Sequence, residues 1–161
     1  MRVHTEKPGE RELRATFSFD PSDIRLEPTL IGTVVHLQDC VTAGDPGSPA
    51  LPKLTARLTL PPRTRLTGMD VRTLATRAIV SEAVAVAPLQ LTRAGKSPRL
   101  VPANPLLYEQ AMRRPVAQLA DTSAEGFNPI VALELNPVRL TPDARLELQS
   151  EIEVILRVLG R

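Results

Sequence analysis

The sequence predicts an all-β fold, a two-layer antiparallel β-sandwich of roughly eight to ten strands with one short helix. Apolar and polar residues alternate along several segments, which is the period of a half-buried strand. The chain has 16 prolines and 8 glycines. Proline cannot lie inside a helix without breaking it but is tolerated at strand ends, so this count favours many short strands over long helices. Aromatic residues make up only 2% of the chain, so the core is expected to consist of Leu, Val, Ile and Ala.

Three segments show the alternation most clearly, at residues 13–19, 53–60 and 144–159. The apolar face of the last segment is formed by Leu146, Leu148, Ile152, Val154, Leu156 and Val158. A helix would scatter these side chains around its circumference, so the segment is predicted to be one long strand. Ser150 is the one polar residue on this face and indicates a β-bulge.

Four weaker strands are expected at residues 30–37, 65–74, 77–87 and 130–135. A helix of about two turns is predicted from Leu106 to Met112, because Asn104 can cap it and Pro105 can occupy its first position. Residues 113–129 show no internal periodicity and are predicted to form a loop.

Length and charge limit the classes of protein to consider. A chain of 161 residues without repeats or linkers is most simply one β-sandwich domain, residues 1–161. Its 20 basic residues are dispersed among 18 acidic ones, giving a formal charge of +2, whereas a nucleic-acid-binding face needs clustered cations. The apolar runs are far shorter than the roughly 20 residues of a membrane span. Residues 1–10 contain no apolar core of a signal peptide, so the protein is cytoplasmic if Met1 is its native start.

The sequence offers little for catalysis, and no cofactor or metal site is expected. Cys40 is the only cysteine, which excludes an intrachain disulfide and a thiolate metal site. His36 is the one candidate to activate this thiol, but four residues of strand at ~3.3 Å each would separate the two side chains by about 13 Å. A helix would bring them together, yet the preceding β-branched run Thr33-Val34-Val35 favours a strand. We therefore expect no enzymatic activity.

A series of proline-marked motifs recurs between residues 44 and 158. The motifs are Gly44-Asp45-Pro46 with Pro49-Ala50-Leu51-Pro52, a strand ending at Leu60-Pro61, Ala87-Pro88-Leu89-Gln90, Asn104-Pro105 with Tyr108, and Asn136-Pro137-Val138-Arg139-Leu140. In their order and spacing, the chain resembles the amino-terminal prodomains of gingipain-type cysteine peptidases, the C25 family.

This resemblance implies a non-catalytic β-sandwich that helps a caspase-like cysteine protease domain to fold and holds it inactive, in cis or in trans. In such prodomains a basic side chain from a loop enters the S1 pocket of the protease. Arg113 and Arg114 are the candidates here, although a solvated surface pair remains the alternative for them. Gly160-Arg161 would be a processing boundary for a protease that prefers arginine, and the protein would be secreted or periplasmic.

A second role stays open on the sequence alone. A β-sandwich can also act as a structural or assembly module, in which an exposed sheet edge pairs with another protein subunit of a larger complex.

Overall fold

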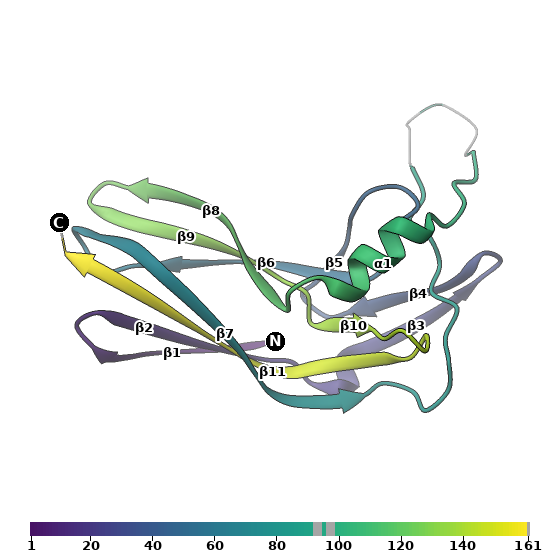
Figure 1. Ribbon diagram of the computed structural model, residues 1–161, viewed down its shortest axis with the longest axis horizontal. Coiled ribbons are helices and arrows are strands. Elements are labelled where there is room, and N and C mark those ends of the chain that lie inside the picture. Colours follow the sequence, from purple (N-terminus) through teal and green to yellow (C-terminus); the bar gives the residue numbers. More distant parts are fainter. Residues whose placement is uncertain (92–94, 96–98, 161) are drawn as a thin grey trace.

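The computed structural model describes residues 1–91, 95 and 99–160, and two antiparallel sheets face each other in it as two layers (Figure 1). The five-stranded sheet has the order β1-β2-β11-β10, with β7 on the opposite edge of β11. Its strands are β1 (Arg2–Gly9), β2 (Glu12–Ser18), β7 (Thr64–Ala78), β10 (Val138–Leu140) and β11 (Leu146–Gly160).

The second layer is a four-stranded sheet of order β5-β6-β9-β8, accompanied by a separate hairpin. The strands of this sheet are β5 (Val41–Thr42), β6 (Pro52–Thr59), β8 (Ala117–Glu125) and β9 (Asn128–Leu135), and the hairpin is β3 (Ile24–Thr29) with β4 (Gly32–Leu37). Two helical elements complete the described chain, the 3₁₀ turn η1 (Pro21–Asp23) and the α-helix α1 (Pro105–Arg113). No helix in the described ranges is long and apolar enough to cross a membrane.

The core lies between the two layers and is aliphatic. β11 contributes its alternate residues, of which Ile152, Val154 and Leu156 are completely buried. β2 contributes Phe17, which is also fully buried, and β9 faces it across the sandwich with Leu133 among others. Each strand hides one face only, which explains the alternation seen in the sequence.

The predicted fold class is confirmed, with eleven strands in the described residues, of which β5 and β10 are only two and three residues long. The strands expected at 13–19, 53–60, 130–135 and 144–159 correspond to β2, β6, β9 and β11, and those at 30–37 and 65–74 to β4 and β7. The helix predicted after Asn104 is α1. The register between β11 and β7 shifts around Ser150, as predicted, and a second shift at Leu74 compensates for it.

Two expectations were wrong. Residues 117–125, which were expected to be part of a loop, form strand β8, whose residues after Gln118 are exposed. An exposed strand has no buried face and therefore no alternation to detect.

The segment 77–87 is not a separate strand. β7 continues to Ala78, and the rest of the segment runs irregularly to a single bridge between Val86 and Thr33. The Ile79 N–H still donates to the carbonyl of Leu146, the first residue of β11, whereas the Val84 N–H donates to the Ala144 carbonyl in the turn before that strand. The apolar residues of this segment thus pack without a continuous ladder.

The two-layer core gives a direct stability test at the pair formed by Phe17 and Val3, which lie opposite each other on β2 and β1. Phe17→Ala is expected to lower the free energy of unfolding by about 3–5 kcal/mol, because it leaves a cavity in a fully buried site. Val3→Ala, at a side chain that is 45% exposed, should change it by less than about 0.5 kcal/mol. Urea unfolding measures both, and equal losses would show that the layers are not packed as described.

Candidate functional site

The two candidate arginines lie at the carboxyl end of α1. The helix begins as its sequence predicts, because the Asn104 side-chain oxygen accepts a hydrogen bond of 3.0 Å from the Leu106 N–H and Pro105 occupies the first turn. Arg113 is the last helical residue, and Arg114 is the C-cap, whose N–H donates to the Ala111 carbonyl over 3.3 Å.

The segment Gly44–Pro52, here called the lead-in, fixes where this helix starts. The Gly47 carbonyl accepts a hydrogen bond of 2.9 Å from the Asn104 N–H, and the Gly47 N–H donates to the Leu89 carbonyl over 2.8 Å. Gly47 has a φ of +87°, and a Cβ at this position would lie 3.0 Å from the Pro102 carbonyl oxygen. Only glycine meets both conditions without strain.

Tyr108 attaches the helix to the sandwich. Its hydroxyl donates a hydrogen bond of 2.6 Å to the Val86 carbonyl, and its ring, like Met112, packs against the core. Burial raises the pKa of the Tyr108 phenol, so this hydroxyl remains a donor to a higher alkaline pH than an exposed phenol does. After the helix, Asn136 holds the chain with two contacts, from its side-chain amide to the Pro115 carbonyl at 3.1 Å and from its N–H to the Val116 carbonyl at 2.8 Å.

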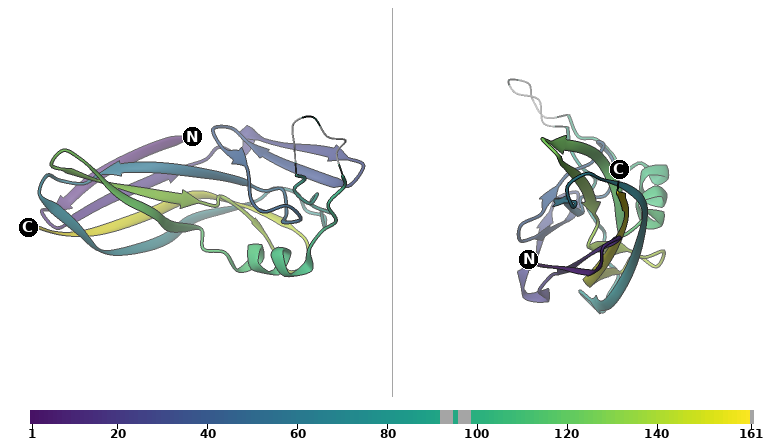
Figure 2. Two further views of the ribbon diagram at one scale, coloured as in Figure 1. Left: turned by 90° about the horizontal axis from the view of Figure 1, so that it is seen from above. Right: turned by 90° about the vertical axis from the view of Figure 1, so that its left-hand side faces the viewer.

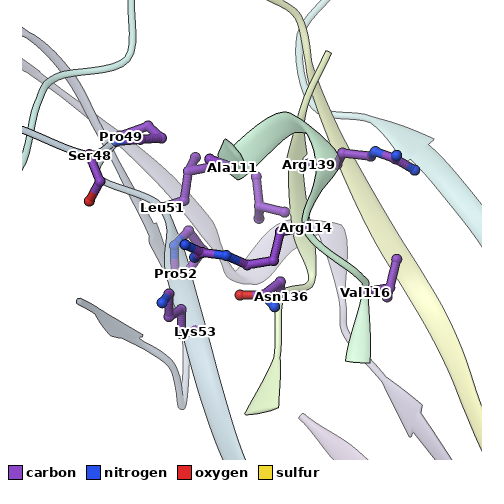
Figure 3. Close-up of a pocket in the computed structure, with 11 residues that line it drawn as sticks. Ser48, Pro49, Leu51, Pro52, Lys53, Ala111, Arg114, Val116, Asn136 and Arg139 are labelled. Carbon is purple, nitrogen blue, oxygen red and sulfur yellow. The ribbon is translucent and has the colours of Figure 1, made fainter. Parts of the chain in front are cut away.

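The two arginines have different surroundings. The Arg113 guanidinium donates to the Glu109 carboxylate over 2.6 Å, one helical turn earlier, and its side chain is 79% exposed. Arg114 is half-buried and, within the described part of the chain, forms no ion pair. In Figure 3 its side chain lies across the surface toward Pro52 and Lys53, whereas Arg139 points away from it.

The hollow beside Arg114 is too small for a ligand. Its volume is about 20 Å³, which suits a single water molecule, and it is lined by the lead-in, the end of α1 and the segment around Asn136. Arg114 therefore does not line a pocket for a small molecule, and Arg113 is not among the residues that line this hollow. Arg161, the candidate processing boundary, lies outside the described residues.

His36, Cys40 and Asp20 lie away from the arginine pair and have surroundings of their own. His36 contacts the Glu27 carboxylate at 2.6 Å, and burial raises the pKa of the Cys40 thiol to about 11. Asp20 caps η1 and accepts hydrogen bonds from the Ser22 backbone and hydroxyl, which lower its pKa. No cluster of three or more His, Cys, Asp or Glu side chains that could hold a metal ion occurs among the residues described.

No protein-family description matches the chain, and no curated protein matches it by sequence. Two solved structures are nevertheless similar over nearly its whole length. A chain from the complex of the pro- and mature domains of RgpB from Porphyromonas gingivalis has a TM-score of 0.69 and 20% identity, with 99% of this chain and 87% of that chain covered. This chain has the fold of a gingipain-type prodomain.

A chain from gingipain K of the same organism, from a structure concerned with zymogenic latency, supports the same conclusion. Its TM-score is 0.62 at 19% identity, and the match covers 99% of this chain and 93% of that chain. The resemblance drawn from the proline-marked motifs is thereby confirmed at the level of the fold. Coverage that is nearly complete in both directions also means that the matched chains are of similar length.

The lead-in of this prodomain-type fold can be tested at its glycine. Gly47→Ala is expected to lower the free energy of unfolding by roughly 2–3 kcal/mol, because it adds a steric clash to an unfavourable φ. Gly126 has a φ of +63° and open space around its Cβ position, so Gly126→Ala should cost only about 1 kcal/mol. Urea unfolding compares them, and an equal cost would contradict the close approach of Pro102 to Gly47.

Cys40 provides a test that depends on pH. Burial raises the pKa of the Cys40 thiol from 9.0 to about 11. Between these two pH values the folded chain keeps the thiol proton, whereas the unfolded chain loses it. The stability from this group is complete below pH 9 and is lost as the pH rises from about 9 to about 11. Urea unfolding across this range should therefore show a smaller pH-dependent loss for Cys40→Ser, and the same loss in both proteins would exclude a buried thiol.

Proposed function

We propose that this chain is a non-catalytic prodomain-like module, one domain over residues 1–161, that binds a caspase-like cysteine protease and either inhibits it or assists its folding. The observation that carries the proposal is the similarity of the fold, over 99% of the chain, to chains from a prodomain–protease complex and from a gingipain zymogen study. Non-polar surface supplies the binding free energy, and an arginine supplies specificity by pairing with a carboxylate in the S1 pocket of the protease.

Arg113 is the better placed of the two arginines for this role. Its guanidinium is already exposed, and its pair with Glu109 is also exposed, so leaving that carboxylate costs only about 0.3–0.5 kcal/mol. To enter an S1 pocket, the Arg114 side chain would first have to leave the surface formed by Pro52 and Lys53. Its packing there favours a role in holding the end of α1 against the lead-in.

The direct test titrates the chain into a C25 protease, such as mature RgpB, and follows peptide hydrolysis. The parent chain is expected to inhibit, and Arg113→Ala to raise the inhibition constant by roughly thirtyfold, as is typical for loss of a central arginine. Arg114→Ala should have a smaller effect. Arg139→Ala is the matched control, because this exposed arginine lines the same hollow but points away from it.

Two outcomes would contradict different parts of the proposal. Absence of inhibition, together with no improvement in the refolding of the protease, would remove the protease-binding role. Equal inhibition by the parent and all three variants would remove only the role of the arginine pair.

The second candidate role, an assembly subunit, is favoured by one specific feature. β7 and β8 each have one edge that no other strand of the described chain covers. Unpaired N–H and C=O groups along such an edge can pair with a strand from another protein. Measuring the size of the purified chain, and of any stoichiometric complex with a non-protease partner, distinguishes this role from the first.

A further inference from the structure

The free edge of β7 is the longest uncovered strand edge in the described chain. β7 is 15 residues long and pairs with β11 along its whole length, while no described strand lies on its other side. In the right-hand view of Figure 2, β7 runs along the outer margin of the five-stranded sheet. This edge offers a row of backbone hydrogen-bonding groups to a further strand.

Two bulges divide this edge and leave a regular centre. The register between β7 and β11 skips Thr67 near one end and Leu74 near the other. Bulges and charges normally protect an edge from pairing, but both bulges lie outside the six residues Gly68–Thr73. The central segment therefore contains no bulge that would interrupt pairing with another strand.

The charges of this central segment are complementary to those of the same segment in a second, antiparallel copy. Asp70 and Arg72 lie on the outer face of the sheet, opposite Ile155 and Glu153 of β11. Arg72 is exposed and forms no ion pair in the part of the chain that the structure describes, whereas Asp70 pairs with Arg157. If a second copy pairs antiparallel about Val71, Asp70 of each copy lies opposite Arg72 of the other, and the pair forms twice. Opposite charges directly across a ladder are stabilising.

The inner face gains apolar contacts in the same register. Val71 and Met69 pack against the core but are only partly buried, since they lie at the margin of the sandwich. Pairing about Val71 sets this residue opposite its own copy and Met69 opposite Thr73 of the second copy. The two aliphatic cores would then continue into each other, and their exposed margins would lose solvent.

Three other free edges, those of β5, β1 and β8, are less suited to pairing with a second copy. β5 has only two residues, and β1 is exposed throughout, with Pro8 and a bulge between Glu6 and Gly9. In β8 the regular part after its bulge is 121–125, and pairing about its centre would place Asp121 opposite Glu125 of the second copy. These like charges repel. We propose that two copies of this chain dimerise through antiparallel pairing of β7 with β7, centred on Val71.

Sedimentation velocity of the full chain over a concentration series tests this dimer. The parent is expected to shift from a mass of 17.6 kDa toward twice that value as its concentration rises. Arg72→Asp makes the segment acidic and Asp70→Arg makes it basic, so each variant alone should lose the dimer. A mixture of the two should recover it, because each acidic residue then meets a basic one.

Matched variants keep the test falsifiable. Arg57→Asp makes the same charge change at an exposed site on β6 and should leave the dimer unchanged. Because Asp70→Arg also removes the ion pair with Arg157, the folding of every variant is checked by circular dichroism. A second measurement needs no charge change: Val71→Cys in a Cys40→Ser background should oxidise to a covalent dimer, since residues on the two-fold axis lie ~4.5–5.5 Å apart between Cα atoms.

Three results would overturn the proposal. They are a parent that stays monomeric at every concentration, a dimer that both single charge variants retain, and folded charge variants whose mixture remains monomeric. The proposal does not rest on protease binding, and inhibition by Arg113 and Arg114 variants is read in a separate assay, so either proposal can fail alone.

Discussion

The pairing of β11 on both of its edges is the constraint on which the rest of the structure depends. One edge pairs with β2 and β10 and the other with β7, so a strand from the end of the chain joins segments from its beginning and middle. Its inner face carries the largest continuous set of buried side chains, which forces the second sheet to cover it. The shift at Ser150 would move every later side chain to the wrong face, and the compensating shift at Leu74 keeps the two strands in register.

The lead-in connects this scaffold to the arginine surface. Proline cannot donate a backbone hydrogen bond, so the N–H groups between the prolines carry the attachment. Those of Gly47 and Ala50 donate to the segment that follows β7, at Leu89 and Ala87, and the Gly47 carbonyl accepts from Asn104 at the start of α1. A segment without regular structure thereby fixes the helix, and the helix places Arg113 and Arg114. The positive φ of Gly47, together with the close approach of the Pro102 carbonyl, explains why this attachment requires glycine.

The sequence was most informative for elements with one fully buried face. β2, β6 and β11 alternate because Phe17, Leu58, Val154 and their neighbours must face the core, and α1 was found from its cap and its first proline. β1 and β8 escaped detection because solvent covers most of both faces, so their pairing leaves no pattern in the residues. β3 and the short strands β5 and β10 were not predicted either. For the site, local signals located the arginine pair. The difference between Arg113 and Arg114 depends on Pro52, about 60 residues away, which no local pattern encodes.

The scarcity of aromatic residues bears on how such a chain can recognise a partner. Interface hot spots are most often Trp, Tyr and Arg, and this chain has no Trp and a single Tyr. Tyr108 is already committed to holding α1, and Phe17 and Phe19 are buried in the core. Phe127, 76% exposed at a hairpin tip, lies under the Arg63 guanidinium at 5.7 Å. For the partners proposed above, specific recognition would therefore rest mainly on arginines and backbone edges, the features that Arg113 and β7 present.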